Sequence, residues 1–288
     1  MKRKNNTPLL LRIVRYLFPK LERWAPWFAN RIFRLVFYVP VGYRVPEKEK
    51  AAEKLATKFL ISVEGKKIQG YRWGDSSGGG YILLVHGWAG RATQFRKFIE
   101  PLQAAGFSII GVDGPAHGQS EGVKTSILEF EKMFKAIIEA EGKPAGVITH
   151  SFGGAAVLYA VMHGLPVRQL VNIASPSIAD EILKTYLRAI NGSWISAAKF
   201  KQFVLKKTGK PFEEFTALHA VRNLVAPINL LMIHDEDDKD VIMRHAEELM
   251  KVYPHAKLFR TSGLGHTRIL KDEQVIAKTI EFLVENRM

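Results

Sequence analysis

The sequence contains no cysteine, which excludes disulfide bonds and thiol chemistry. It has no run of about 20 apolar residues, the length that a membrane-spanning helix needs, and no paired-histidine zinc motif of the His-Glu-x-x-His kind. Acidic residues are fewer than basic ones: the sequence has 28 Asp and Glu and 42 Lys and Arg. We therefore expect a cytoplasmic protein that uses no cofactor and no catalytic metal.

Hydrophobic residues make up 47% of the 288 residues, enough for the core of one large domain. Short apolar runs alternate with helix-forming stretches, which predicts βαβ units and a largely parallel sheet. An antiparallel hairpin is expected at its edge, with strands at 58–63 and 66–73. The other expected strands begin near residues 81, 107, 145, 168, 227 and 256, and the helices lie near 92–105, 122–141, 153–163, 241–252 and 272–286.

The most informative motif is the stretch Thr149-His150-Ser151-Phe152-Gly153-Gly154. An apolar, strand-forming run precedes it and a helix-forming run follows it, so a serine is expected at the tip of a sharp strand-to-helix turn. This arrangement is a nucleophile elbow. Threonine stands at position 149, where a first glycine is usual. We expect Ser151 to be the nucleophile and His150 to pack beside it without reacting.

A second motif, His86-Gly87-Trp88-Ala89-Gly90, follows the apolar run at 81–85. Such a loop can turn a main-chain N–H group toward the nucleophile, where it would stabilise a developing oxyanion. We predict that the N–H groups of Trp88 and Phe152 form this oxyanion hole. His86 is expected to be a structural loop residue, and so are Asp113 and His117 in the next loop.

An acid and a base follow later strands. The strand near 227–234 ends in carboxylates, among which Asp237, Asp238 and Asp240 can each orient a histidine. His266 follows the strand near 256–261 and is the candidate general base, because an imidazole can accept and return a proton near neutral pH. Serine, acid and histidine thus occur in this order, each just past a predicted strand.

Over residues 56–286 the chain resembles the α/β-hydrolase superfamily, specifically its serine hydrolases of the esterase and lipase type. The resemblance implies a mostly parallel sheet with flanking helices in a domain covering 51–288, and a helical cap inserted at about 178–225. The family's His-Gly-x-x-Asp-x-x-Val pattern falls on 234–241, with Asp235 replacing the glycine, so this register implies that Asp238 is the acid.

The expected function is cleavage of a carboxylic ester or related acyl bond through an acyl-enzyme intermediate. Ser151 would attack the carbonyl of a small acyl substrate, with His266 as base and Asp238 orienting it. Trp88 and the aromatic N-terminus favour lipophilic acyl groups. An acyltransferase or lyase on the same scaffold, and a binding protein without turnover, are the alternatives.

Residues 1–50 form a different kind of segment, in which basic and large apolar residues alternate. Residues 1–45 hold ten Lys or Arg and one acid, Glu22. We predict one or two amphipathic helices, broken at Pro19 and Pro26. Such helices can lie on an anionic membrane surface, peripheral to its inner face; the alternative is packing against the hydrolase domain. No motif for recognising nucleic acid accompanies the charge.

Overall fold

The structure is a computed structural model that describes residues 9–75 and 80–287. These residues form two compact units, described separately below. The first combines residues up to Val39 with Ala179–Glu214, and the second combines Pro40–Ile178 with residues from Phe215 onward. The first unit thus joins residues from two segments, at the N-terminus and in the predicted insertion, that are far apart in sequence.

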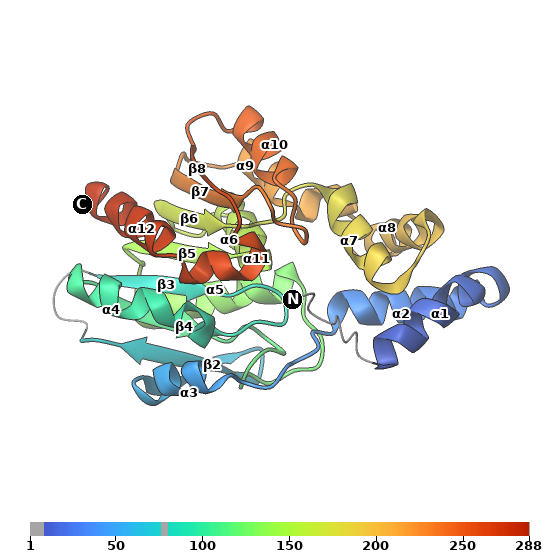
Figure 1. The fold of residues 1–288 in the computed structure, drawn as a ribbon, viewed down its shortest axis with the longest axis horizontal. Helices are drawn as coiled ribbons and strands as arrows, with labels where there is room; N and C mark the ends of the chain where they lie inside the picture. Colours follow the sequence, from blue (N-terminus) through green and yellow to red (C-terminus); the bar gives the residue numbers. More distant parts are fainter. Residues whose placement is uncertain (1–8, 76–79, 288) are drawn as a thin grey trace. The chain divides into compact units, whose positions relative to one another are not determined.

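In the part of the chain that the structure describes, the α-helices of the first unit (Figure 1) are α1 (Leu9–Trp24), α2 (Pro26–Tyr38), α7 (Ala179–Ile190) and α8 (Trp194–Thr208). Helix α1 packs against α2 and α7, and α2 also packs against α8. The rings of Phe33 on α2 and Phe200 on α8 lie 5.3 Å apart in its interior. Among the described residues, no helix is long and apolar enough to span a bilayer.

The predicted helix break at Pro26 is confirmed, because α2 begins there, but the predicted break at Pro19 is wrong. Helix α1 continues through Pro19. A proline inside a helix leaves the carbonyl four residues earlier without its N–H donor. Here that carbonyl belongs to Arg15, and it accepts a hydrogen bond from the Asn191 side chain at 3.3 Å. A tertiary contact with the end of α7 thus replaces the lost helical bond.

The second unit is built on one eight-stranded sheet in the order β1-β2-β4-β3-β5-β6-β7-β8. Strand β2 pairs antiparallel with β1 and β4, and all other pairs are parallel. The predicted edge hairpin is confirmed. The strands are β1 (Thr57–Val63), β2 (Lys66–Trp73), β3 (Tyr81–Val85), β4 (Ser108–Val112), β5 (Gly146–His150), β6 (Gln169–Ile173), β7 (Asn229–Asp235) and β8 (Lys257–Thr261).

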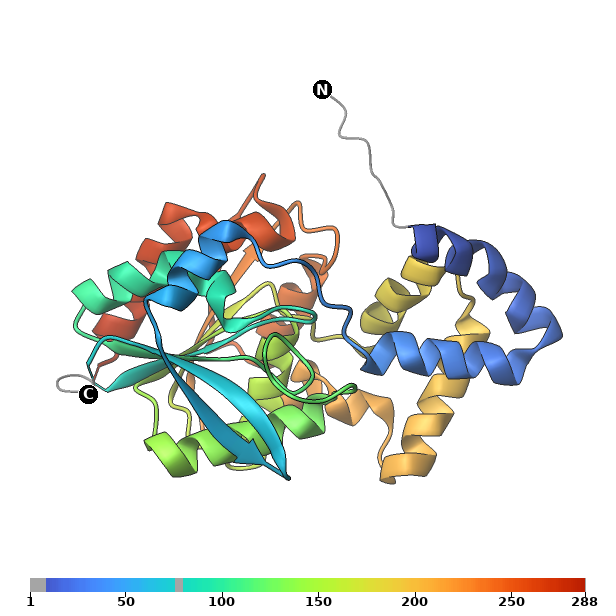
Figure 2. The same cartoon turned by 90° about the horizontal axis from the view of Figure 1, so that it is seen from below.

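Helices cover both faces of this sheet (Figure 2). Because side chains alternate along a strand, β3 serves both layers: Leu83 and Val85 lie in one core with α5 and α6, whereas Ile82 and Leu84 lie in the other with α4 and α12. The helices of this unit are α3 (Glu47–Lys54), α4 (Arg96–Ala104), α5 (Ile127–Glu141), α6 (Phe152–Met162), α9 (Ala217–Arg222), α10 (Arg244–Val252), α11 (Gly265–Arg268) and α12 (Glu273–Glu285).

Candidate active site

Ser151 stands between β5 and α6, at the carboxyl edge of the parallel strands. Its φ of 52° and ψ of −126° are unusual for a residue with a side chain, and such backbone strain persists only where the surroundings hold it. The Ser151 N–H donates to the Ile173 carbonyl at 2.9 Å, and the Ser151 carbonyl accepts from the Gly154 N–H at 3.0 Å. Neighbouring structure therefore fixes the turn that presents the hydroxyl.

Small residues around Ser151 allow the strand and helix to approach closely. A Cβ atom on Gly153 would lie 2.6 Å from the His86 carbonyl oxygen, and one on Gly87 would lie 2.8 Å from the Ser151 Cβ. Thr149 fits where glycine is usual because it lies within β5, where its hydroxyl donates to the Val171 carbonyl at 3.2 Å. The threonine side chain is therefore accommodated within the strand and does not have to fit into the tight turn.

Asp238 and His266 form a direct pair. Asp238 Oδ2 accepts from His266 Nδ1 at 2.7 Å, and Asp238 Oδ1 accepts from the N–H groups of Asp240 and Val241, both at 2.9 Å. Burial would raise the pKa of Asp238, but these hydrogen bonds and the nearby imidazole outweigh it and hold the pKa below its usual value. The carboxylate stays ionised and fixes the Nδ1–H tautomer of His266.

The neighbouring carboxylates play other roles. Asp237 Oδ2 accepts from the Gly263 N–H at 2.8 Å, and Asp240 is exposed and gives its own N–H to Asp238. Of the three acids that the sequence left open, Asp238 accepts the hydrogen bond that the structure describes from the His266 ring. The geometry favours Asp238 as the acid that orients His266, and this assignment stays a prediction.

Asp235 organises the loop that carries His266, a role that the sequence analysis missed. This fully buried carboxylate accepts from four donors: Oδ1 from the N–H groups of Asp237 (3.1 Å) and Gly265 (2.8 Å), and Oδ2 from the Thr261 hydroxyl (2.8 Å) and the Leu264 N–H (3.1 Å). Because Gly265 immediately precedes His266, Asp235 connects the loop that carries Asp238 to the loop that carries His266.

We expect Asp235→Asn to lower kcat about 10- to 100-fold with little change in KM. The amide nitrogen of asparagine would face two donors, so the loop must move, and displacement of a reacting group by about 1 Å can cost about 100-fold. Steady-state kinetics on a chromogenic ester measures the effect. Thr261→Val, which removes a single donor to the same carboxylate, is the matched control and should cost less than about threefold. An unchanged kcat in Asp235→Asn would contradict this role.

His150, which directly precedes Ser151 in the chain, contacts His266. The His150 Nε2–H donates to the His266 carbonyl at 2.8 Å, and the two rings lie 4.7 Å apart. Burial and the neighbouring His266 lower the pKa of His150 to about 3, so it stays neutral. Within the described chain, no hydrogen bond joins the Ser151 hydroxyl to the His266 ring. Such contacts are often long in a free enzyme and tighten when substrate binds.

The two residues predicted to supply the oxyanion hole lie together. The rings of Trp88 and Phe152 are 5.5 Å apart, edge to face, and Phe152 packs on Phe130 at 5.0 Å. Phe152 is the first residue of α6, and the N–H groups in a helix's first turn have no acceptor within the helix. The main-chain N–H of Phe152 therefore lies next to Ser151, at a helix N-terminus, which favours a negative charge.

His86, Asp113 and His117 are loop scaffolding, as predicted. His86 accepts from the Gly114 N–H at 2.7 Å and donates to the Gly87 carbonyl at 2.7 Å. Asp113 accepts from the N–H groups of Ala92 and Gln119. Burial lowers the pKa of His86 to about 4 and that of His117 to about 3. Both imidazoles are neutral near pH 7 and are fixed by the loops they support.

Comparison with known proteins agrees with the observed fold. The family model described as the alpha/beta hydrolase fold matches residues 80–192, which include the oxyanion loop and the elbow. The structure resembles the Pyrococcus furiosus esterase Pf2001, with a TM-score of 0.66, 20% identity and coverage of 86% of this chain and 98% of that one. The chain therefore has the α/β-hydrolase fold.

Two of three further similar proteins are hydrolases by name. A putative lipase from Acinetobacter baumannii AYE aligns with a TM-score of 0.65 and 18% identity, over 85% of this chain and 98% of that chain. The uncharacterized hydrolase YugF of Bacillus subtilis (strain 168) is 32% identical over 106 residues, which cover 35% of this chain but only 38% of YugF. The uncharacterized protein YqkD of the same bacterium is 25% identical over 265 residues, 85% of this chain and 84% of YqkD.

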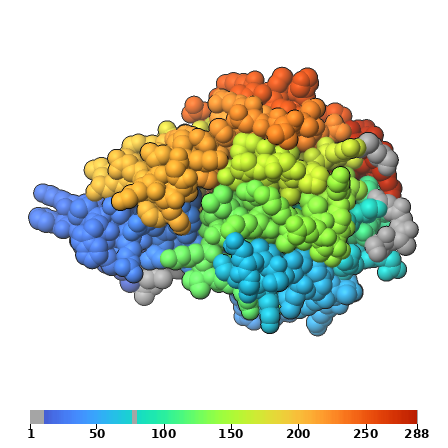
Figure 3. All heavy atoms as spheres, turned by 180° about the vertical axis from the view of Figure 1, so that it is seen from behind, coloured from blue at the N-terminus to red at the C-terminus, as the bar shows by residue number. Residues whose placement is uncertain are grey.

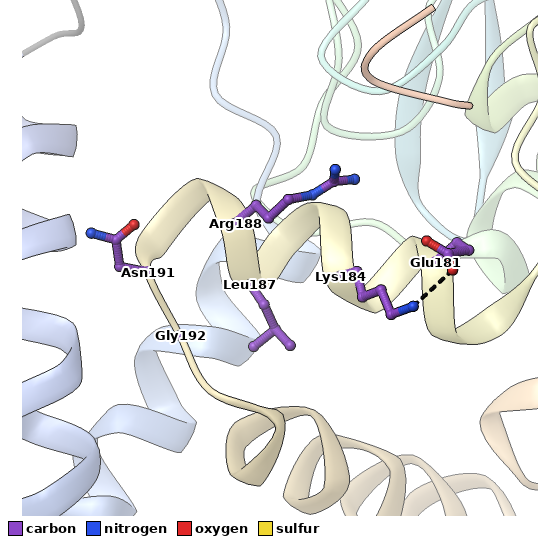
Figure 4. A pocket seen from close by; sticks show the side chains of 6 residues that line it. All are labelled: Glu181, Lys184, Leu187, Arg188, Asn191 and Gly192. Carbon is purple, nitrogen blue, oxygen red and sulfur yellow. Dashed lines mark hydrogen bonds and ion pairs between the residues drawn. The ribbon is translucent and has the colours of Figure 1, made fainter.

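Two pockets of the described structure are lined by residues other than the candidate catalytic ones. One, of about 170 Å³ in the second unit, is lined in part by Arg91, Tyr43 and Asp113. Arg91 is buried, donates to the Tyr43 carbonyl at 3.0 Å, and has two nitrogens without a hydrogen-bond partner. Figure 4 shows the other, of about 460 Å³ along α7 in the first unit, where Lys184 pairs with Glu181 at 2.8 Å.

The ligand atoms of Asp238, Asp240 and His266 lie within 4.8 Å of one another, a spacing that a metal ion could use. The hydrogen bonds of the site compete with such use, because His266 Nδ1 must carry a proton to donate to Asp238. A cation at Nδ1 would replace that proton and break the pair. These donors therefore fit a proton-transfer site better than a metal site.

The site predicts a pH dependence of stability. Hydrogen bonds hold the pKa values of both Asp235 and Asp238 below the usual 3.8 despite burial. As the pH falls, these two carboxylates are therefore protonated in the unfolded chain before they are protonated in the folded protein. The ionised carboxylates stabilise the folded protein fully above about pH 4, and this contribution to the free energy of unfolding is lost as the pH falls through the lowered pKa values. Urea unfolding between pH 3 and 6 should show this acid loss, with a smaller slope in Asp235→Asn. Equal slopes would contradict the assignment.

Proposed function

We propose that this α/β hydrolase is a serine hydrolase that cleaves a carboxylic ester or related acyl bond through a covalent acyl-enzyme. The observation that carries the proposal is the 2.7 Å hydrogen bond between Asp238 and His266, on a loop that His150 joins to the strained turn at Ser151. A nucleophile, a base and an orienting acid on adjacent strand ends are the groups that acyl transfer requires.

In the first half-reaction, the Ser151 oxygen bonds to the substrate carbonyl carbon while its proton passes to His266 Nε2. The carbonyl oxygen becomes an oxyanion, which the N–H groups of Trp88 and Phe152 stabilise. The bond to the leaving oxygen then breaks, and His266 protonates that oxygen. Asp238 stabilises the transient imidazolium.

In the second half-reaction, water attacks the acyl carbon while His266 removes its proton. The bond to Ser151 breaks, the proton returns to the serine oxygen, and a carboxylic acid is released. The half-buried rings of Trp88 and Phe152 beside the elbow support a preference for an apolar acyl group, because they offer nonpolar surface next to the reacting carbon.

The test combines covalent labelling with turnover. A fluorophosphonate should label the full-length protein, and peptide mapping should place the label on Ser151. p-Nitrophenyl esters of increasing chain length should be hydrolysed, with kcat/KM rising above that for the acetate. Absence of both labelling and turnover would refute the proposal. If an added alcohol diverts the acyl group while release of nitrophenol continues, the protein is an acyltransferase that uses the same residues.

A further inference from the structure

Exposed large apolar side chains are concentrated in the helical first unit. In the described chain, ten of the seventeen such residues belong to this unit, although it contains only about a quarter of the residues. Its surface on α1, α2, α7 and α8 is coloured blue and gold in Figure 3. The ten are Ile13, Tyr16, Leu17, Trp24, Trp27, Phe28, Leu35, Trp194, Ile195 and Leu205.

These residues do not form the core of the unit. Phe18 on α1 is completely buried, and Phe33 on α2 is only 1% exposed. On other faces of the same helices, Trp24 is 77% exposed and Trp27 is 71% exposed. A typical surface helix has one apolar face, which packs on the core, and a polar face toward solvent. Helices α1 and α2 differ, because they also carry large apolar side chains on the solvent-exposed face. The outer side chains therefore require a different explanation from folding of the unit.

Cations lie directly beside these exposed aromatic rings. The Lys20 ammonium is 3.7 Å from the centre of the Tyr16 ring, and the Arg23 guanidinium is 5.1 Å from that of Trp24. Residues 9–39 and 179–214 contain thirteen Lys or Arg against five Asp or Glu. Exposed aromatic rings and positively charged groups thus lie side by side on α1, in a unit with an excess of cations.

The only acid of α1, Glu22, is held by hydrogen bonds at the start of another helix. Glu22 accepts hydrogen bonds from the Ser193 N–H at 3.0 Å and from the Ser196 hydroxyl at 2.6 Å, both at the start of α8. The same contact places the N-terminal end of α8, with exposed Trp194 and Ile195, beside the C-terminal end of α1.

We propose that the outer surface of α1, α2 and the start of α8 binds the surface of an anionic lipid bilayer. Tryptophan favours the headgroup region, where its ring meets acyl chains and its N–H meets water, and lysine and arginine pair with lipid phosphates. A nucleic acid would use the cations but would leave Ile13 and Leu17 without an apolar partner. A second copy of the chain would bring like charges together.

The test is co-sedimentation of the full-length protein with vesicles. Vesicles that contain phosphatidylglycerol should bind it and pure phosphatidylcholine vesicles should not, with binding weakened by salt. The Trp24→Ser/Trp27→Ser double variant should bind at least tenfold more weakly. Lys20→Glu/Arg23→Glu should also lose more than tenfold, since each cation near an anionic surface contributes about fivefold.

Matched controls come from the second unit. Val123→Ser/Val225→Ser removes two apolar side chains of similar exposure, and Lys48→Glu/Lys54→Glu reverses two exposed charges on α3. Both should bind vesicles as the parent does. Equal losses in test and control variants, binding to neutral vesicles alone, or displacement by single-stranded RNA would overturn the proposal. Labelling of Ser151 in detergent-free buffer is scored separately, so failure of the proposed hydrolase activity is distinguishable from failure of membrane binding.

Discussion

Replacing Ser151 with alanine is expected to lower kcat/KM for a p-nitrophenyl ester by at least about 10⁴-fold. The substitution removes the proposed nucleophile, so the proposed acyl-enzyme could not form, and only transition-state stabilisation by the surrounding site would remain. A factor of 10⁴ corresponds to about 5.4 kcal/mol of activation free energy. Ester hydrolysis measured over a range of substrate concentrations gives the ratio, and fluorophosphonate labelling should disappear at the same time.

Ser175 provides a matched control. It follows the neighbouring strand β6, is equally buried, and its hydroxyl would lie 2.6 Å from a Cβ atom on Gly154 in the elbow. Ser175→Ala therefore removes a hydroxyl from the same region without removing the proposed nucleophile, and its kcat/KM should stay within about twofold of the parent. Retention of more than a tenth of the activity by Ser151→Ala, or an equal loss in Ser175→Ala, would exclude Ser151 as the nucleophile.

Much of the second unit could be predicted from sequence because its signals are local. A strand that is buried on both faces must be apolar throughout, so runs such as Tyr81–Val85 are visible in the sequence. The carboxyl ends of parallel strands meet at one edge of the sheet, which is why Ser151, Asp238 and His266 could be grouped. Their actual contacts depend on loops whose paths the sequence does not specify.

Asp235 illustrates that limit. The sequence marks it only as a departure from the family's glycine, in a run of carboxylates of similar appearance. Its importance comes from four donors, and two of them, from Leu264 and Gly265, lie about 30 positions along the chain. Such long-range hydrogen bonds follow from the return of β8 beside β7, which no local pattern encodes.

Pro19 illustrates the same limit in the first unit. Proline is a sound predictor of a helix break when only the helix is considered. The helix survives because Asn191, more than 170 residues away, donates to the carbonyl that Pro19 leaves without a donor. The grouping of residues 9–39 with 179–214 rests on contacts of this kind, and neither segment contains a pattern that identifies the other.

Replacing Asp238 with asparagine should lower kcat about 10⁴-fold, and the reason lies in the fixed roles of its two oxygens. Oδ1 accepts from two main-chain N–H groups, those of Asp240 and Val241. In asparagine the carbonyl oxygen must keep that position, because an NH₂ group cannot face two donors. The NH₂ group then points at His266 Nδ1 and donates to it.

Donation to Nδ1 places the histidine proton on Nε2, the atom that must accept the Ser151 proton. The variant thus holds the base in the wrong tautomer, a change that costs about 10⁴-fold in serine proteases. Asp237→Asn disturbs one bond to Gly263 and should cost less than about tenfold, and Asp240→Asn, at an exposed position, less than about threefold. Comparable losses of kcat in the three variants would exclude Asp238 as the acid that orients His266. Thermal unfolding separates lost chemistry from lost structure, because the wrong tautomer lowers kcat in a protein that still melts cooperatively.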